Sequence, residues 1–289
     1  MKSSLVYALW FAMTTLFLNT PDAHFTAPIE SSSGPAGVDR LYVIDCGDGI
    51  GLDESRWTLG ANAGRQIEFP DHCYLIHHRR GWLLWDTGID DAVALLPHHE
   101  KIYHEWGAGT GPIWRKPKTL SSQLNELHIH ASDIQMIAVS HSHPDHAGNV
   151  EMFPNAVLLV QRAEYEWAGS RQDTIAFNRS HRVQLLDGDY DIFKDHSLVL
   201  LATPGHTPGH QSLLVRLPKT GSVILSGDAA HFTTSFTHRY VPTNSWDKEA
   251  TLHSMDKLAE IMAKEHAQLW FNHDHDQSAI QLKSPSHYE

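Results

Sequence analysis

The chain has 289 residues, of which 41% are apolar and 9% aromatic, so it can bury the core of a folded domain. This composition excludes an intrinsically disordered chain and a collagen-like structure. Its 34 acidic residues outnumber the 22 Lys and Arg and give a net charge of −12. Without a basic excess we expect no nucleic-acid partner.

The first 27 residues have the pattern of a secretory signal peptide. Lys2 precedes an apolar run over 5–18, which is shorter than the ~20 residues of a membrane-spanning helix. An uncleaved anchor and a packed N-terminal helix are the alternatives. We expect a periplasmic or secreted protein that is not inserted in a membrane after signal cleavage. Residues 28–39 then form a linker, and residues 40–289 a single domain.

The chain contains two cysteines, Cys46 and Cys73. They can pair as a disulfide in an oxidising compartment, but a sequence does not give the distance between them. A disulfide and two buried thiols both remain open. Two thiolates are too few for a structural zinc site built from cysteines alone.

After the linker, the pattern of apolar residues predicts a strand-rich domain with a few interspersed helices. Strands are predicted over residues 41–44, 73–78, 82–85, 134–139, 157–160, 198–202, 212–217, 223–225 and 267–271. Helices are predicted over residues 119–130, 163–168 and 247–266. Residues 47–71 and 97–118 are interpreted as long loops, which usually serve function. This order favours two sheets sandwiched between helices.

Histidine occurs 23 times, more often than Lys and Arg together, and it is the commonest metal ligand. The densest cluster follows the strand predicted over 134–139 and contains His141, His143, Asp145 and His146. Strand ends point side chains into the crevice where sites form in layered folds. His141 and His143 can face one metal ion, and the two residues beyond them can face a second. Without a metal, burying so many polar groups would be costly.

Three more candidate ligands lie where later strands give way to loops. His206 follows the strand over 198–202, Asp228 follows the strand over 223–225, and His273 follows the last strand. Either histidine alone can be a surface residue, but the set of three together indicates a metal site. Neighbours that can compete as ligands are His210, His231 and His275.

The His-x-His-x-Asp-His run, the later Gly-His and Gly-Asp pairs and the final histidine resemble the motifs of the metallo-β-lactamase superfamily. The Asp86-Thr87-Gly88 turn is similar to that superfamily's early Asp-Thr-Gly turn. The resemblance covers residues 40–280 and implies an αββα sandwich of two mixed β-sheets flanked by helices, with two divalent metal ions, of which zinc fits best. It implies that one ion is bound by His141, His143 and His206, the other by Asp145, His146 and His273, and both by a bridging Asp228.

Within the superfamily, the ligand spacing and the segments 140–149 and 204–210 are most similar to the N-acyl-homoserine lactone lactonases, which are quorum-quenching enzymes. This resemblance implies that hydroxide held by two metal ions hydrolyses the lactone ring of a small N-acyl-homoserine lactone. Asp228 argues against the zinc β-lactamases, which usually lack a bridging aspartate. Other ester, thioester and phosphotriester hydrolases of the superfamily are alternatives, and an RNA-processing nuclease is disfavoured by the acidic charge.

The candidate catalytic residues are Asp145, as a proton shuttle to the leaving oxygen, and His231. The lactonases usually carry a tyrosine where this chain has His231, and an imidazole N–H can donate the same hydrogen bond to the substrate carbonyl. Aromatic residues of the two long loops can form a groove for the acyl chain. They are Trp57, Phe69, Tyr103, Trp106 and Trp114.

An alternative hypothesis of a different functional class is an exported, histidine-rich metal-binding protein without turnover. It predicts metal uptake by histidines outside the cluster, namely His77, His78, His98 and His99. The sequence leaves open the metal identity, the oligomeric state and the acyl-chain preference.

Overall fold

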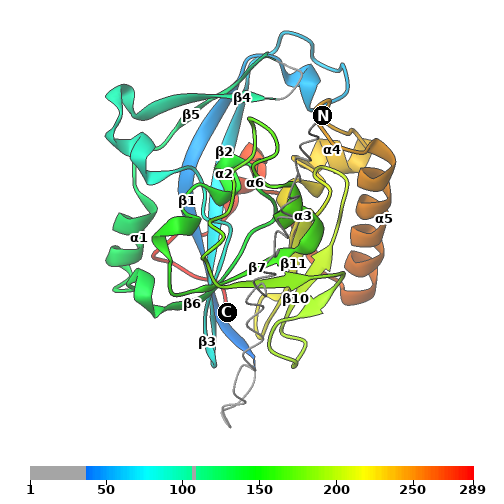
Figure 1. Cartoon of the computed structure of the whole chain (residues 1–289). Coiled ribbons are helices and arrows are strands. Elements are labelled where there is room, and N and C mark those ends of the chain that lie inside the picture. Colours follow the sequence, from blue (N-terminus) through cyan, green and yellow to red (C-terminus); the bar gives the residue numbers. More distant parts are fainter. Residues whose placement is uncertain (1–36, 106–108) are drawn as a thin grey trace, which may run out of the picture.

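The computed structural model describes residues 37–105 and 109–289, which fold into two facing β-sheets with helices on their outer faces (Figure 1). The αββα sandwich predicted from the sequence is confirmed. The predicted signal peptide and most of the predicted linker lie outside the described residues. The last two linker positions, Val38 and Asp39, belong to the first strand.

The larger sheet has eight strands in the order β4-β5-β1-β2-β3-β6-β7-β8. They are β1 (Val38–Gly51), β2 (Ile67–His78), β3 (Gly81–Trp85), β4 (Glu100–Glu105), β5 (Gly109–Arg115), β6 (Ile134–Ala138), β7 (Val157–Gln161) and β8 (Val183–Leu186). The neighbours β3, β6, β7 and β8 pair in parallel, whereas the other neighbouring strands pair antiparallel. The sheet is therefore mixed.

The smaller sheet has five strands in the order β13-β12-β11-β10-β9. They are β9 (Tyr190–Asp191), β10 (Leu198–Ala202), β11 (Gln211–Leu217), β12 (Gly221–Leu225) and β13 (Gln268–Trp270). Only β12 and β13 pair in parallel in this sheet, as far as the structure describes it. The sequence analysis missed the short strands β8 and β9, which are too brief to show a clear alternation.

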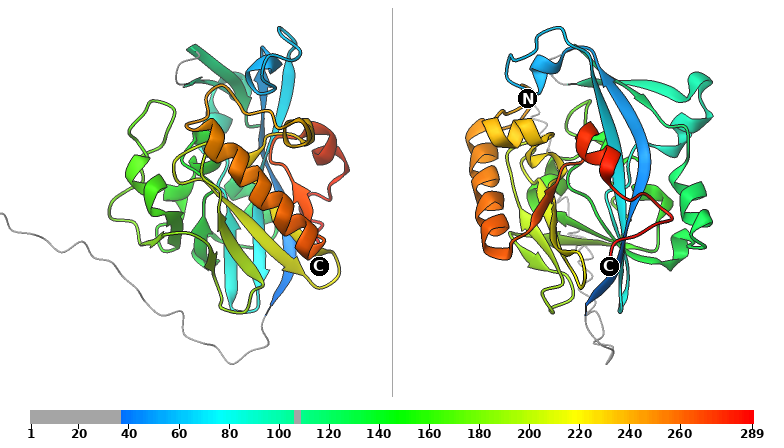
Figure 2. Two further views of the ribbon diagram at one scale, coloured as in Figure 1. Left: turned by 90° about the vertical axis from the view of Figure 1, so that its right-hand side faces the viewer. Right: turned by 180° about the vertical axis from the view of Figure 1, so that it is seen from behind.

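Two helices mark the outer faces, with α5 beside the smaller sheet and α1 beside the larger one (Figure 2). The described helices are α1 (Leu120–Glu126), α2 (Pro144–Ala147), α3 (Arg162–Trp167), α4 (Thr233–His238), α5 (Lys248–Glu265) and α6 (His275–Ile280). The Asp247 side chain accepts a hydrogen bond from the Ala250 N–H and so caps α5. The Thr119 side chain caps α1 in the same way by accepting from the Ser122 N–H.

Three apolar layers follow from this arrangement. Along β1, Leu41 and Val43 pack between the two sheets, whereas Tyr42 and Ile44 pack on the side of α1. This alternation is the two-residue period of a strand that is buried on both faces. A third layer packs α5 onto the smaller sheet.

The prediction of long loops over 47–71 and 97–118 is wrong in part. β1 extends to Gly51, β2 begins at Ile67, and β4 and β5 form a hairpin within the second segment. The sequence analysis interpreted the glycines near residue 50 as loop residues, but two of them make room for aromatic rings. A Cβ atom on Gly49 would lie 2.8 Å from the Trp114 ring, and one on Gly51 would lie 2.6 Å from the Phe69 ring.

Cys46 of β1 and Cys73 of β2 form a disulfide with a Cα–Cα distance of 6.0 Å, which decides the alternative left open by the sequence. Both residues are fully buried. Among the described residues, we find no helix with the length and apolar character needed to span a membrane.

Candidate metal centre

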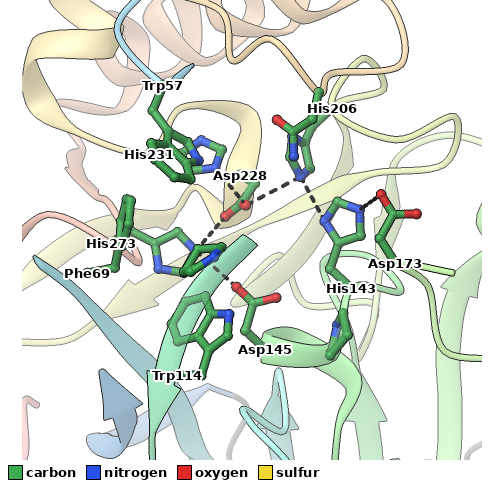
Figure 3. Close-up of a pocket in the computed structure, with 13 residues that line it drawn as sticks. Trp57, Phe69, Trp114, His143, Asp145, Asp173, His206, Asp228, His231 and His273 are labelled. Carbon is green, nitrogen blue, oxygen red and sulfur yellow. Dashed lines mark hydrogen bonds and ion pairs between the residues drawn. The ribbon is translucent and has the colours of Figure 1, made fainter. Parts of the chain in front are cut away.

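The ligands predicted from the sequence converge at one end of the sandwich, although they come from distant parts of the chain. Figure 3 labels His143, Asp145, His206, Asp228 and His273 among them. The ligands lie in segments that follow strands: the first cluster follows β6 and includes two residues of α2, and the later residues follow β10, β12 and β13. All of them are buried or nearly so. They are His141, His143, Asp145, His146, His206, Asp228 and His273.

Three imidazoles form the first half of the centre. The Nδ1 atom of His143 lies 2.8 Å from Nε2 of His141 and 3.1 Å from Nε2 of His206. Burial lowers the pKa of all three imidazoles, and for His141 and His206 it does so strongly. Neutral imidazoles are the form that binds metal ions.

Two imidazoles and a carboxylate form the second half. The Oδ2 atom of Asp145 lies 3.6 Å from Nε2 of His146 and 3.6 Å from Nε2 of His273. Burial by itself lowers the pKa of both imidazoles, but the Asp228 and Asp145 carboxylates outweigh it. They raise the pKa of His273 to about 9 and that of His146 well above its usual value.

The Asp228 carboxylate lies between the two halves. Its Oδ1 atom is 3.3 Å from Nε2 of His146 and 3.2 Å from Nε2 of His273. Its Oδ2 atom is 3.4 Å from Nε2 of His206 and 3.9 Å from Nε2 of His141. Each oxygen therefore faces one half, which is the arrangement expected of a carboxylate shared by two cations.

A buried carboxylate outside the ligand set supports each half. Asp86 accepts hydrogen bonds from Nδ1 of His146 (2.9 Å) and from the backbone N–H of Ser140 (2.6 Å). Glu164 accepts hydrogen bonds from four groups, namely the Ser142 N–H and hydroxyl, the Thr207 hydroxyl and the Gly209 N–H. Glu164 thus ties the loop of His141 to the loop of His206.

The neighbouring histidines differ in their surroundings. His210 uses both ring nitrogens, because Nδ1 donates to the Thr203 carbonyl oxygen and Nε2 accepts from the Asp228 N–H. His275 is exposed and faces Glu68, away from the ligand set. His231 does join the cluster, because its Nε2 atom lies 3.1 Å from Oδ2 of Asp228.

The donor set fits divalent cations. In the described structure, the buried Nε2 atom of His146 and the buried Oδ1 atom of Asp228 lack hydrogen-bond partners. Orphaned buried polar atoms are costly, and a cation between them would remove that cost. The neighbouring Nδ1 atom of His273 donates to the Pro70 carbonyl oxygen (2.9 Å), which leaves its Nε2 atom available as a ligand.

A family profile described as the metallo-beta-lactamase superfamily matches residues 67–264. The chain belongs to the metallo-beta-lactamase superfamily. Among curated relatives, an N-acyl homoserine lactonase of Bacillus cereus is 33% identical over 247 residues, covering 83% of this chain and 95% of that protein. The N-acyl homoserine lactonase AttM of Azorhizobium caulinodans is 32% identical over 265 residues, covering 86% of this chain and 98% of that protein.

Solved structures of this superfamily agree in fold. A crystal structure of a Bacillus thuringiensis AiiA mutant with N-decanoyl-L-homoserine at its active site has a TM-score of 0.76 and 30% identity, covering 87% of this chain and 99% of that one. An N-acyl homoserine lactone hydrolase with N-hexanoyl-L-homoserine at its catalytic metal centre gives the same TM-score, identity and coverage.

In this superfamily member the ligand cluster opens into a pocket that both apolar and polar side chains line. One side of the pocket is apolar and the other is polar (Figure 3). The apolar side includes Trp57, Phe69 and Trp114, and the polar side includes Asp173. Pro112 and Asn244 also line the pocket. Trp106 and the Tyr103 side chain, also predicted to border the groove, lie outside the described part of the chain.

Sequence reasoning missed three residues that shape this centre. Glu164 and Asp173 carry no motif that marks them, and Oδ2 of Asp173 lies 4.0 Å from Nε2 of His143. Asp86 stands in a turn that the sequence did indicate, but the contact of its carboxylate with His146 depends on folding. Within the described structure, the outlying His77, His78, His98 and His99 belong to no group of potential metal ligands.

Proposed function

We propose that this metal-dependent hydrolase opens the lactone ring of N-acyl-homoserine lactones and thereby quenches quorum-sensing signals. The observation that carries the proposal is Asp228, whose two oxygens face two separate ligand sets at the base of a half-apolar pocket. Its relatives support the choice of substrate, because two curated lactonases are 32–33% identical over more than four fifths of the chain.

The proposal includes two divalent metal ions, with zinc as the expected metal. His141, His143 and His206 would hold one ion, Asp145, His146 and His273 the other, and Asp228 both. Such ions lower the pKa of bound water toward ~7 and polarise a carbonyl group. Imidazole and carboxylate are the ligand types that zinc takes in catalytic sites.

Two side chains of the pocket would act on the substrate. An imidazole N–H of His231 would donate a hydrogen bond to the lactone carbonyl oxygen and stabilise the negative charge that develops there. Asp145 lines the same pocket; it would take a proton from the attacking water and pass it to the ring oxygen when the C–O bond breaks. Neither step requires a serine or cysteine nucleophile.

The acyl chain would lie along the apolar side of the pocket. Trp57 contacts Phe69 with ring centroids 4.7 Å apart, and Phe69 stacks on Phe232 at 5.6 Å. These packed rings offer a surface for methylene groups and exclude water from the reacting carbonyl. The substrate amide would then lie toward Asp173 and Asn244.

We also propose that the protein acts outside the cytoplasm, as its N-terminal sequence suggests. The Cys46–Cys73 disulfide supports this location, because disulfides persist in oxidising compartments. Cell fractionation, with the mass of the mature chain, tests the proposal. An intact N-terminus on a cytoplasmic protein with two free thiols would contradict it.

The decisive experiment measures metal content together with turnover of N-hexanoyl- and N-decanoyl-homoserine lactone. The expected result is two metal ions per chain and hydrolysis of both lactones. A panel with a thioester, a phosphotriester and a β-lactam tests the alternative hydrolases, and preferential turnover of one of these would overturn the lactonase proposal. Metal binding with no hydrolysis of any ester would instead indicate a metal-binding protein without turnover.

A further inference from the structure

We propose that the Cys46–Cys73 disulfide positions the second half of the metal centre, acting through the 86–88 turn on His146. The inference rests on the metal ligands assigned under the proposed function. It adds the two cysteines as positioning residues, which contact neither substrate nor ligand atoms but fix the place of a ligand.

The turn lies directly on the disulfide. Gly88 has a φ of +66°, and a Cβ atom built on it would lie 2.4 Å from Cβ of Cys46. The same atom would lie 2.8 Å from Sγ of Cys46 and 2.9 Å from Sγ of Cys73. Because real Cβ contacts are longer, only glycine allows the backbone to approach the two sulfur atoms so closely.

The 86–88 turn bonds both the backbone and the imidazole ring of His146. The Thr87 N–H and hydroxyl donate to the His146 carbonyl oxygen at 2.7 and 3.1 Å. The Gly148 N–H donates to the Gly88 carbonyl oxygen at 3.0 Å. Asp86 accepts from Nδ1 of His146 at 2.9 Å, which directs Nε2 toward Asp228. A shift of the turn would therefore displace this ligand.

A buried lysine joins the disulfide to the end of the turn. Lys116 is fully buried, and its Nζ atom donates to the Ile89 carbonyl oxygen at 2.6 Å and to the Cys46 carbonyl oxygen at 3.3 Å. Its charge is balanced by Asp91, whose Oδ1 atom lies 3.3 Å away. Two contacts thus link the strand that carries Cys46 to the residues at the end of the turn. Gly88 packs on the disulfide, and the Lys116 ammonium group bonds the carbonyl oxygens of Cys46 and Ile89.

The first half of the centre is supported differently. Glu164 holds the loops of His141 and His206, and Glu164 belongs to α3 rather than to the turn. Among the described residues, the turn reaches His141 through Ser140, whose hydroxyl lies 3.0 Å from Nδ1 of His141. Loss of the disulfide should therefore weaken metal binding in the second half far more than in the first.

The test compares the wild type with Cys46→Ser/Cys73→Ser by titrating metal-free protein with Co²⁺ and recording its visible spectrum. We expect the wild type to bind two ions. In the double variant, affinity for the second-half ion should fall about 10- to 100-fold, the usual effect of losing an outer-shell partner. Its spectrum at one equivalent should match that of His273→Ala, in which only the three-histidine half is complete.

Leu217→Ala serves as the control for a general loss of stability. Leu217 is buried between the sheets at the far end of β11, so its truncation should lower the melting temperature and leave both cobalt affinities unchanged. Equal weakening of both ions in the cysteine variant, or weakening of neither, would overturn the inference. A wild type that does not bind two ions would instead overturn the ligand assignment of the proposed function.

A second variant covers the case in which the serine pair does not fold. Cys46→Val/Cys73→Ala retains most of the apolar volume of the two sulfur atoms and is titrated in the same way. If neither pair folds, Thr87→Val decides, because it keeps the disulfide and removes the hydroxyl that bonds His146. An unchanged second cobalt affinity in that variant would show that the Thr87 hydroxyl does not position His146 and would overturn this step of the inference.

Discussion

The two halves of the metal centre differ in nearly everything except their place in the fold. Burial lowers the pKa of the imidazoles of the first half, whereas nearby carboxylates outweigh burial and raise those of the second half. Glu164 supports the first half and the 86–88 turn supports the second. The second half also borders the aromatic side of the pocket, since His273 lies 5.9 Å from the rings of Phe69 and Trp114. Different parts of the sequence therefore support the two ligand sets, and substitutions should affect metal binding in one half more than in the other.

Replacing Asp228 should impair metal binding in both halves at once and have the largest effect on activity. Asp228→Ala removes the carboxylate that both halves share, so we expect loss of both metal ions and a fall in lactone hydrolysis of at least about 10³-fold. Elemental analysis and the hydrolysis rate measure the two effects. Asp256→Ala, which removes an exposed aspartate on α5, should change neither. Full metal content in Asp228→Ala would contradict the bridging role.

Removing one ligand from each half should separate them. His141→Ala should lose the ion of the first half and His273→Ala the ion of the second, and both should lose more than about 10²-fold in activity. Metal analysis after dialysis should give one ion per chain in each variant. Retained zinc stoichiometry together with normal turnover in His141→Ala would exclude this residue as a ligand.

The supporting carboxylates should act on one half each, with a smaller effect. Glu164→Gln cannot accept all four of its hydrogen bonds, and we expect about 10- to 100-fold weaker binding in the first half. Asp86→Asn should weaken metal binding in the second half by a similar factor. The neutral amide does not compensate the positive charge that the raised pKa of His146 favours. Competition with a chromophoric chelator measures both affinities. The comparison fails if either variant weakens both halves equally.

Truncating the aromatic side of the pocket should change the preference among substrates more than the chemistry. Trp114→Ala removes a ring that borders His273, so we expect hydrolysis of the decanoyl lactone to change about 10-fold relative to the hexanoyl lactone. The ratio of kcat/KM values for the two lactones is the measurement. An unchanged ratio would remove Trp114 from the acyl groove.

The smallest expected effect is an opposite pH dependence of the two halves in the metal-free protein. The unfolded histidines titrate near 6.5. The folded first half keeps its imidazoles neutral at lower pH, so its contribution to stability is present above pH 6.5 and is lost on acidification. The His273 contribution is present below pH 6.5 and is lost as the pH rises through its folded pKa of about 9.

Urea unfolding of the metal-free protein between pH 5 and 10 measures this difference. Replacing His141 should flatten the acid side of the stability profile, and replacing His273 should flatten the alkaline side. The same change of slope in both variants would show that the halves do not differ in protonation.

Most of the ligand set could be predicted from the sequence, because each ligand directly follows a short apolar run and the runs end at the same edge of a layered fold. The extension of β1 to Gly51 could not, since Gly49 and Gly51 resemble turn residues until the Trp114 and Phe69 rings are seen against them. Glu164 could not be predicted either, because its donors come from two segments that only folding brings together. The pairing of Cys46 with Cys73 depends on a distance that the sequence does not contain.

Glu164 has a thermodynamic consequence for the loading of metal ions. Its four hydrogen bonds order the loops of His141 and His206 while the chain folds, so the conformational entropy of those loops is already lost before an ion arrives. An ion that entered the first half would therefore meet preorganised donors, and little of its coordination energy would go into ordering the loops. By the same reasoning, chelators should extract the ion without melting the loops.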